Sequence, residues 1–210
     1  MKVVEKRMKS KTVAFGRILK RYDIPLNLID DLNEKYEEHR KNLNSFGPRL
    51  AGRLDSELEF THKISECKIS EIIVDCMNDY VESIEDVNLF FGTKDLEILS
   101  CWINDMKEGE YNPPHTHHDL SGWSTVLFLK VPEFINDTKK NPHKFRDGQL
   151  GFVWPDGVSC HWVEPKVGQF YIFEARHQHC VMPFKTKIKG ETRRSMSFNF
   201  IQKPKAVSDK

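Results

Sequence analysis

The amino-acid sequence predicts an α+β fold that is mainly β, a jelly roll with N-terminal helices packed on the outside of one sheet. Apolar residues recur at helical spacing only before Gly92, and after it the chain breaks into short apolar or alternating runs separated by Gly, Pro, Asn and Asp. Strands that follow grouped helices suit a sandwich or barrel covered on one outer face. The length fits a single domain, residues 1–210, with a mainly helical part (1–92) and a jelly-roll core (93–203).

The composition argues against several classes of protein. The chain carries 32 Lys and Arg against 31 Asp and Glu, and a net charge of +1 is too small to attract nucleic acid or an acidic membrane. No apolar run approaches the length of a membrane span, and the N-terminus lacks the apolar core of a secretory signal. Five cysteines without CxxC spacing suit reduced thiols rather than a disulfide framework. We therefore expect a soluble, cytoplasmic protein whose oligomeric state the sequence does not indicate.

The first half of the chain predicts one strand and two helices. Residues 12–19 have the β-branched and aromatic content of a strand. Pro25 suits the first turn of a helix, whose N–H groups lack partners, and apolar residues at near-helical spacing extend this helix to about Asn44. Residues 65–87 carry one apolar stripe, which predicts a second amphipathic helix that packs on a sheet.

Six runs in the second half predict the strands of the jelly roll. Each run is short, apolar or alternating, and ends at turn-forming residues. They span residues 96–104, 124–131, 149–154, 169–174, 180–183 and 193–201. The intervening segment 133–147 is rich in basic residues and predicts a solvated loop.

A histidine-rich stretch, YNPPHTHHD at residues 111–119, is the centre of the functional prediction. Side chains alternate along an extended chain, so His117 and Asp119 project from the same face and can share a metal ion. His179, at the entry to a later predicted strand, is the candidate third ligand, because a jelly roll brings distant strands together at one mouth. Two histidines and one carboxylate with open coordination positions suit non-haem Fe(II) oxygen chemistry.

Two consecutive arginines begin the last predicted strand, and strand phase separates their roles. Arg193 shares its face with small polar residues such as Ser195, whereas Arg194 shares the other face with Met and Phe. The polar face should line the barrel mouth, so we expect Arg193 to bind an anion through its planar fork, with Ser195 as a supporting donor. We expect the head of Arg194 to lie in solvent at the sheet edge. The alternative for Arg193 is a simple ion pair with Glu174 or Glu191.

These motifs, taken in order, resemble the Fe(II)/2-oxoglutarate-dependent oxygenase superfamily, and most of all a branch of small, mostly uncharacterised bacterial and phage members. The segments that carry the resemblance are WIN at 102–104, GEYNPPHTH at 109–117, STV at 124–126, VP at 131–132, GQFYIF at 168–173, HCVMP at 179–183 and RRSMSFN at 193–199. The resemblance covers residues 96–201. It implies a double-stranded β-helix, the jelly roll that this superfamily shares with cupins.

The resemblance also implies a set of metal ligands. His117, Asp119 and His179 would bind Fe(II) as the catalytic centre. Members of the branch often keep His-x-His without the acid two residues further on, which leaves His115 as an alternative ligand or as a group that supports the ligands.

A second implication concerns the co-substrate and the reaction. Arg193 with Ser195 would hold the distal carboxylate of 2-oxoglutarate, which chelates the iron and leaves one position for O2. Asn104 and Tyr111 would lie near this cofactor pocket. The implied activity is hydroxylation of an unidentified small-molecule or peptide substrate, with release of succinate and CO2.

Other interpretations stay open from the residues alone. A cupin-like metal-binding protein would use His115, His117 and His179 without 2-oxoglutarate, and it would not need an inward arginine. A non-catalytic β-sandwich interaction module would carry its histidines on the surface. The weakest alternative is a structural zinc site, because its ligand pairs lack a zinc-knuckle spacing. Its members would be Cys160, His161, His177 and Cys180.

Overall fold

The structure is a computed structural model that describes residues 17–85, 95–117, 122–135, 146–154, 156–157 and 159–203. Within these ranges the elements in chain order are β1 (Leu19–Asp23), α1 (Leu26–His39), η1 (Arg40–Asn42), η2 (Gly47–Arg49), β2 (Glu57–Glu59), η3 (Ile64–Glu66), α2 (Ser70–Glu85), β3 (Leu96–Met106), β4 (Asn112–His115), β5 (Trp123–Lys130), β6 (Leu150–Val153), β7 (Cys160–Val163), β8 (Gln169–Glu174), β9 (His179–Val181) and β10 (Arg193–Gln202). Neither α-helix in the described part is long and apolar enough to cross a membrane.

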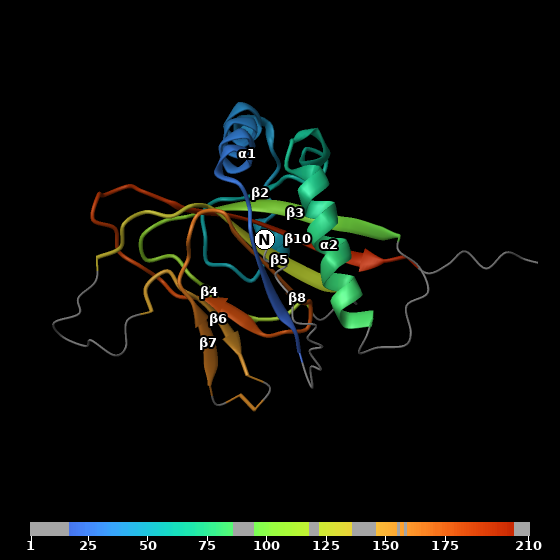
Figure 1. The fold of residues 1–210 in the computed structure, drawn as a ribbon. Helices are drawn as coiled ribbons and strands as arrows, with labels where there is room; N and C mark the ends of the chain where they lie inside the picture. The colour runs from blue at the N-terminus through green and yellow to red at the C-terminus, as the bar shows by residue number, and fades with distance from the viewer. Residues whose placement is uncertain are drawn as a thin grey trace, which may run out of the picture.

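The strands form two antiparallel sheets. The six-stranded sheet has the order β1-β8-β5-β10-β3-β2, and the four-stranded sheet has the order β4-β9-β6-β7. From β3 onward the chain passes back and forth between the sheets, except that β6 and β7 are neighbours in the smaller sheet, and this is the winding of a jelly roll. In Figure 1 strands β6 and β7 lie below the larger sheet. The predicted fold, mainly β and of the double-stranded β-helix type, is confirmed. That residues 1–210 form a single domain stays a prediction.

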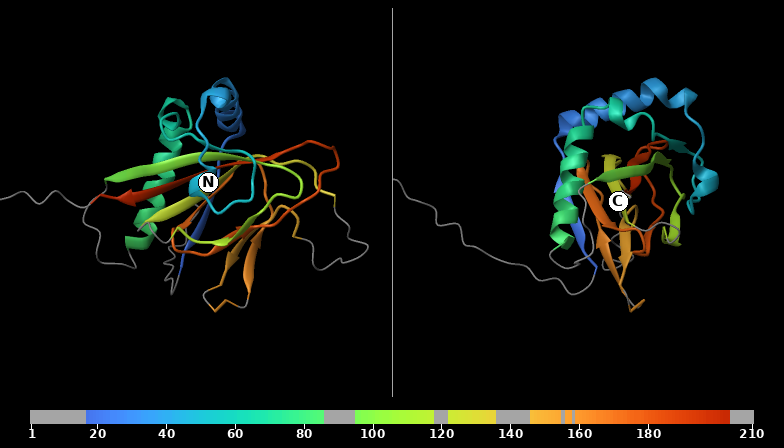
Figure 2. Two further views of the ribbon diagram at one scale, coloured as in Figure 1. Left: turned by 180° about the vertical axis from the view of Figure 1, so that it is seen from behind. Right: turned by 90° about the vertical axis from the view of Figure 1, so that its right-hand side faces the viewer.

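Both α-helices lie on the outer face of the six-stranded sheet, away from the smaller sheet (Figures 1 and 2). Helix α1 follows Pro25 and buries Ile29, Leu32 and Tyr36 at helical spacing. Helix α2 buries a similar stripe that includes Tyr80. Both stripes pack on apolar side chains of the large sheet. The predicted covering of one outer face by the N-terminal helices is therefore confirmed.

The space between the two sheets is part apolar core and part cavity. The core draws side chains from both sheets. Its buried members are Met106, Val126, Phe128, Leu150, Phe152, Val163, Tyr171, Phe173, Val181 and Phe184. The cavity lies beside this core and is lined by histidine, arginine, serine and asparagine side chains.

The strands that the sequence patterns misplace or omit are the four edge strands. β1 runs over Leu19–Asp23, later than the strand predicted at 12–19, and residues 12–16 lie outside the described residues. β2, β4 and β7 match no predicted run. An edge strand pairs on one side only, so it tolerates charged residues and proline, as the Asn-Pro-Pro-His sequence of β4 illustrates.

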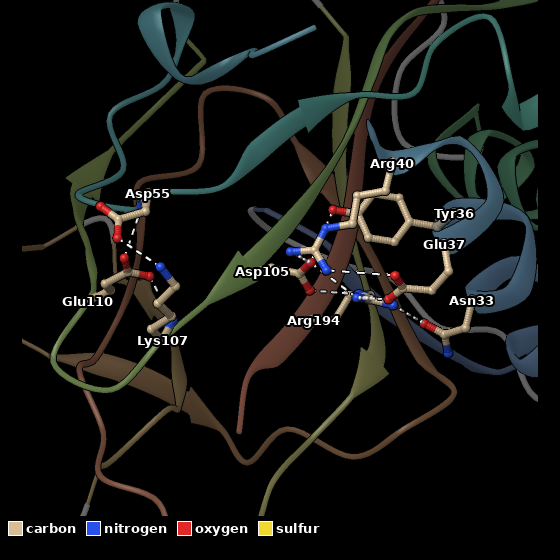
Figure 3. A network of polar contacts seen from close by, with 9 residues as sticks. All are labelled: Asn33, Tyr36, Glu37, Arg40, Asp55, Asp105, Lys107, Glu110 and Arg194. Carbon is tan, nitrogen blue, oxygen red and sulfur yellow. Dashed lines mark hydrogen bonds and ion pairs between the residues drawn. The ribbon is translucent and has the colours of Figure 1, made fainter. Parts of the chain in front are cut away.

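Arg194 is buried beneath α1 and is 4% exposed, so the prediction that its head lies in solvent is wrong. Its guanidinium donates to both carboxylate oxygens of Asp105, at 2.6 and 3.1 Å, and to Glu37 at 2.6 Å. It also lies 4.4 Å from the centre of the Tyr36 ring, whose hydroxyl donates to Asp105 (Figure 3). A buried arginine is tolerated here because a buried carboxylate neutralises it and several acceptors satisfy its donors.

Asp105→Ala is expected to lower the free energy of unfolding by about 3 kcal/mol, because it leaves Arg194 buried without its main counter-ion. The pair of Asp55 and Lys107, 2.9 Å apart on the surface, provides the control (Figure 3). Asp55→Ala removes a carboxylate that is 74% exposed and is expected to cost under about 1 kcal/mol. Urea denaturation measures both values. Equal costs would show that the buried network does not stabilise the packing of α1 on the sheet.

Candidate active site

Three histidines from two neighbouring strands gather at one edge of the four-stranded sheet. His115 ends β4 and lies directly opposite His179 in β9, and His117 follows two residues later. The ring centres are 4.3 Å apart for His115 and His179, 5.3 Å for His117 and His179, and 5.4 Å for His115 and His117. One possible ligand atom from each ring lies within 4.8 Å of those of the other two.

Hydrogen bonds to the backbone determine which nitrogen is free in two of the rings. His115 Nδ1 lies 2.8 Å from the carbonyl oxygen of Pro113, and His179 Nδ1 lies 2.9 Å from that of His177. A carbonyl oxygen only accepts, so both Nδ1 atoms carry the hydrogen and both Nε2 lone pairs are free. Burial lowers the pKa of all three rings, that of His117 to about 4. The rings are therefore neutral near pH 7, the form that binds a metal ion.

The cluster fits a divalent metal ion. Imidazole nitrogens bind such ions at about 2.0–2.1 Å, and rings whose nitrogens already lie within 4.8 Å of one another need only small shifts to reach that distance. No other group of three or more candidate ligands is brought together in the part of the chain that the structure describes. The predicted carboxylate ligand, Asp119, lies outside the described residues. His115, the alternative ligand, thus completes a cluster with His117 and His179.

The alternative zinc site is not formed. Cys160, His161, His177 and Cys180 are all described, and their ligand atoms do not gather. Strand β6 separates β7 from β9, so the two cysteines lie two strands apart, about 10 Å, too far for one ion. His177 instead places its Nε2 3.1 Å from the carbonyl oxygen of Val153.

Arg193 is buried in the same cavity as the histidines, and no carboxylate of the described residues pairs with it. It is 2% exposed, and its Nε and Nη2 have no hydrogen-bond partner among the described residues. Its Cζ lies 4.9 Å from the centre of the Phe128 ring, and burial lowers the pKa of the guanidinium to about 10. Glu174, one predicted alternative partner, lies beside Arg17 instead, and no described ion pair joins Arg193 to Glu191. A buried positive charge without a partner indicates a site for an anion.

The predicted phase of β10 is confirmed. Arg193, Ser195 and Ser197 line the cavity. Met196 and Phe198, with opposite phase, belong to the core beneath the helices. The polar face of the strand therefore looks inward between the sheets, as alternation along the strand requires.

The cavity has further polar and aromatic residues in its wall. Asn104 lines it opposite Ser195 of the neighbouring strand, and the Asn104 Oδ1 has no hydrogen-bond partner among the described residues. Trp102 forms part of the wall, with its ring 5.9 Å from that of His117. Tyr111, which the resemblance places near the cofactor, is 41% exposed and does not line the cavity.

Glu57, which no sequence pattern marks, is a second buried charge in this cavity. It lies in β2 directly opposite Asn104 and is 3% exposed. Burial and the negative charge of Glu110 raise its pKa to about 7. The alternation of the three-residue strand Glu-Leu-Glu was the available signal, but so short a run does not separate Glu57 from Glu59.

Glu57→Gln is expected to stabilise the ligand-free protein at pH 8 but not at pH 5. The folded-state pKa of about 7 lies above the ordinary value of 4.5, so the contribution of Glu57 to stability is present below pH 4.5 and is lost as pH rises through 7. The gain at pH 8 should be about 1–3 kcal/mol in urea denaturation. Glu59→Gln, on the same strand, is the control. An equal gain at both pH values would contradict this explanation.

Residues 100–199 match the family model described as "Putative 2OG-Fe(II) oxygenase". The matched residues, 100 of the chain's 210, are similar to those of 2OG-Fe(II) oxygenases. They contain the three histidines of the cluster together with Arg193 and Ser195. This oxygenase family uses Fe(II), 2-oxoglutarate and O2, and the histidine cluster is suited to bind the iron. No curated protein matches the sequence of this chain.

Two solved structures resemble this chain in fold. A prolyl-4-hydroxylase from Pseudomonas putida superposes with a TM-score of 0.61 at 20% identity, over 89% of this chain and 93% of that one. A prolyl hydroxylase from Trichoplax adhaerens, solved in complex with a hypoxia inducible factor oxygen degradation domain peptide fragment, gives a TM-score of 0.56 at 12% identity, over 91% of this chain and 87% of that one. At these identities the likeness concerns the fold alone.

Proposed function

We propose that this protein is a 2-oxoglutarate-dependent dioxygenase that hydroxylates its substrate and releases succinate and CO2. The observation that carries the proposal is the presence, in one cavity, of a three-histidine cluster and a buried guanidinium that has no counter-ion among the described residues. The histidines suit a divalent metal ion, and the guanidinium suits a carboxylate. 2-Oxoglutarate is a dicarboxylate, so one molecule can chelate the metal and occupy the arginine.

His115, His117 and His179 are the proposed iron ligands. Backbone carbonyls hold the rings of His115 and His179 with their Nε2 atoms free, which is the role of supporting groups around metal ligands. Iron, when bound, would activate O2, which is the oxidant for attack on a C–H bond, and 2-oxoglutarate would supply two of the electrons that reduce O2. Because all three ligands are neutral, they leave the charge of the ion to be balanced by the anionic co-substrate.

Arg193 is the proposed anchor for the distal carboxylate of 2-oxoglutarate. Its Nε and Nη2 are free to donate two parallel hydrogen bonds, the geometry in which arginine binds carboxylates most strongly. The Ser195 hydroxyl projects from the same face of β10 and can add a third donor. The Phe128 ring beneath the guanidinium excludes water, and exclusion of water strengthens such a charged pair.

The proposed substrate is a small molecule or a peptide. A peptide fragment accompanies the Trichoplax adhaerens prolyl hydroxylase in its structure, which supports a peptide substrate as one of these two options. The near-zero net charge gives no support for nucleic acid. A cytoplasmic location stays a prediction.

The test of this function is spectroscopic. Anaerobic protein supplied with Fe(II) is expected to develop a weak visible charge-transfer band when 2-oxoglutarate is added, and to release succinate from 2-oxoglutarate in air. A cupin-like metal-binding protein would bind Fe(II) but would show neither the band nor succinate. Absence of the band in the wild-type protein would reject the proposal.

A further inference from the structure

The cavity has a second polar end, remote from Arg193. Glu57, Asn104 and Ser195 lie opposite one another across β2, β3 and β10, so Glu57 and Ser195 are two strand spacings apart, about 10 Å. Glu57 belongs to the edge strand of the large sheet, and Asn112 belongs to β4, the edge strand of the small sheet. Both residues line the cavity together with Gly52.

The oxygen atoms at this end have no hydrogen-bond donors among the described residues. The Glu57 carboxyl is buried, and neither a hydrogen bond nor a cation offsets the effect of burial on it. The Asn112 Oδ1 is also buried without a hydrogen-bond partner. Glu57 Oε1 and Asn112 Oδ1 each lie 2.5 Å from the position that a Cβ on Gly52 would occupy, so both border one small space that the glycine leaves open. A buried carboxyl without donors is costly unless a ligand supplies them.

We propose that Glu57, with Asn112 beside it, receives a primary ammonium group of the substrate. This inference rests on the proposed function, because it concerns the substrate that shares the cavity with 2-oxoglutarate. An ammonium group brings one positive charge and three N–H donors, which match a carboxylate and an amide oxygen. The same carboxylate repels the carboxylates of 2-oxoglutarate and so favours their binding at Arg193.

The wall between Glu57 and the histidines suits the carbon chain of such a substrate. The Trp102 ring lines the cavity, lies 5.9 Å from His117 and stacks on Phe46 at 5.4 Å, so it presents a fixed apolar surface. Glu110 adds negative charge near Glu57, while its own oxygens already accept hydrogen bonds from backbone N–H groups. An alkylammonium group therefore has its charge at Glu57 and its C–H bonds along Trp102, toward the cluster.

The test is calorimetric titration of the full chain, loaded anaerobically with Fe(II) and 2-oxoglutarate, with n-butylammonium as the probe. Tetramethylammonium carries the charge without N–H donors, and 1-butanol carries a donor without the charge. We expect n-butylammonium to bind about tenfold more tightly than either. A lysyl tripeptide with blocked ends separates the two sources of an ammonium group: tighter binding than n-butylammonium indicates a protein substrate, and weaker binding indicates a free amine.

Two variants connect the binding to Glu57. Glu57→Gln keeps the shape and removes the charge, and it is expected to weaken n-butylammonium binding by about tenfold or more. Glu59→Gln should change it by less than about twofold, because Glu59 does not line the cavity. Three outcomes would each overturn the proposal: unchanged affinity in Glu57→Gln, equal affinity for 1-butanol, or no saturable binding of n-butylammonium to the wild-type protein.

The charge-transfer band, recorded on the same samples, tests the proposed function separately. If the wild-type protein forms the band and any of these three outcomes is observed, only the proposal of the ammonium site is rejected. If the wild-type protein forms no band, the proposed function is rejected. Titration of the metal-free protein with n-butylammonium then tests the role of Glu57 independently.

Discussion

Arg193→Leu is expected to raise the dissociation constant of 2-oxoglutarate by about a thousandfold, the effect of removing one partner from a buried charged pair. The variant removes two N–H donors that have no partner in the described structure and that face the cavity over the Phe128 ring. Titration of the Fe(II)-loaded protein with 2-oxoglutarate, followed by the charge-transfer band, measures the loss. Arg193→Lys keeps the charge without the planar fork, so its affinity for 2-oxoglutarate should lie between that of the wild-type protein and that of Arg193→Leu.

The same variant should make the ligand-free protein more stable. Leucine replaces a buried charge that has no counter-ion among the described residues. Even buried ion pairs can gain about 1–4 kcal/mol of stability when apolar residues replace them, and we expect a gain of this order here. Binding and stability are thus expected to change in opposite directions, which a purely structural arginine would not do. A loss of stability together with normal 2-oxoglutarate binding would reject the anchoring role.

His115→Ala is expected to weaken Fe(II) binding by more than about a hundredfold, because it removes a ligand rather than a group that supports one. Asp119→Ala is expected to leave the affinity within about tenfold, the lower limit for supporting groups. The reason for this ranking is that His115 lies opposite His179 with its Nε2 free. Anaerobic competition with a coloured Fe(II) chelator measures both affinities.

His161→Ala is the control for the metal measurement, because this exposed histidine of β7 lies outside the cluster. Its Fe(II) affinity should match that of the wild-type protein. The opposite ranking, with metal lost in Asp119→Ala and kept in His115→Ala, would restore the two-histidine, one-carboxylate centre that the sequence predicts.

The six strands that the sequence predicts in the second half of the chain are the six interior strands of the two sheets: β3, β5, β8 and β10 in one and β6 and β9 in the other. An interior strand pairs on both sides and packs on a core, so it carries the apolar or alternating pattern that sequence reasoning detects. The edge strands lack this pattern. Two of them, β2 and β4, carry Glu57 and His115, so the site residues that sequence reasoning missed or ranked second lie where the strand signal is weakest.

The buried ion pairs of Arg194 could not be predicted from the sequence. Alternation along the strand predicts which face of the sheet this residue occupies, and that face is correct. It does not predict that Glu37, 157 residues earlier, would reach the guanidinium from α1. Ion pairs between distant segments depend on how the layers pack, and they leave no periodic pattern in the sequence.

Neighbouring arginines on β10 serve opposite sides of one sheet, and this constrains the alignment of the strand. A slip by one residue would exchange the two faces of the strand, so Ser195 and Ser197 would leave the cavity and Met196 and Phe198 would leave the core beneath the helices. The contacts that Arg194 makes with α1 therefore help to fix the alignment of the strand that also carries Arg193. A shortened chain without α1 would keep both arginines but lose the contacts of Arg194 with Asn33 and Glu37, so it is expected to hold β10 less firmly in register.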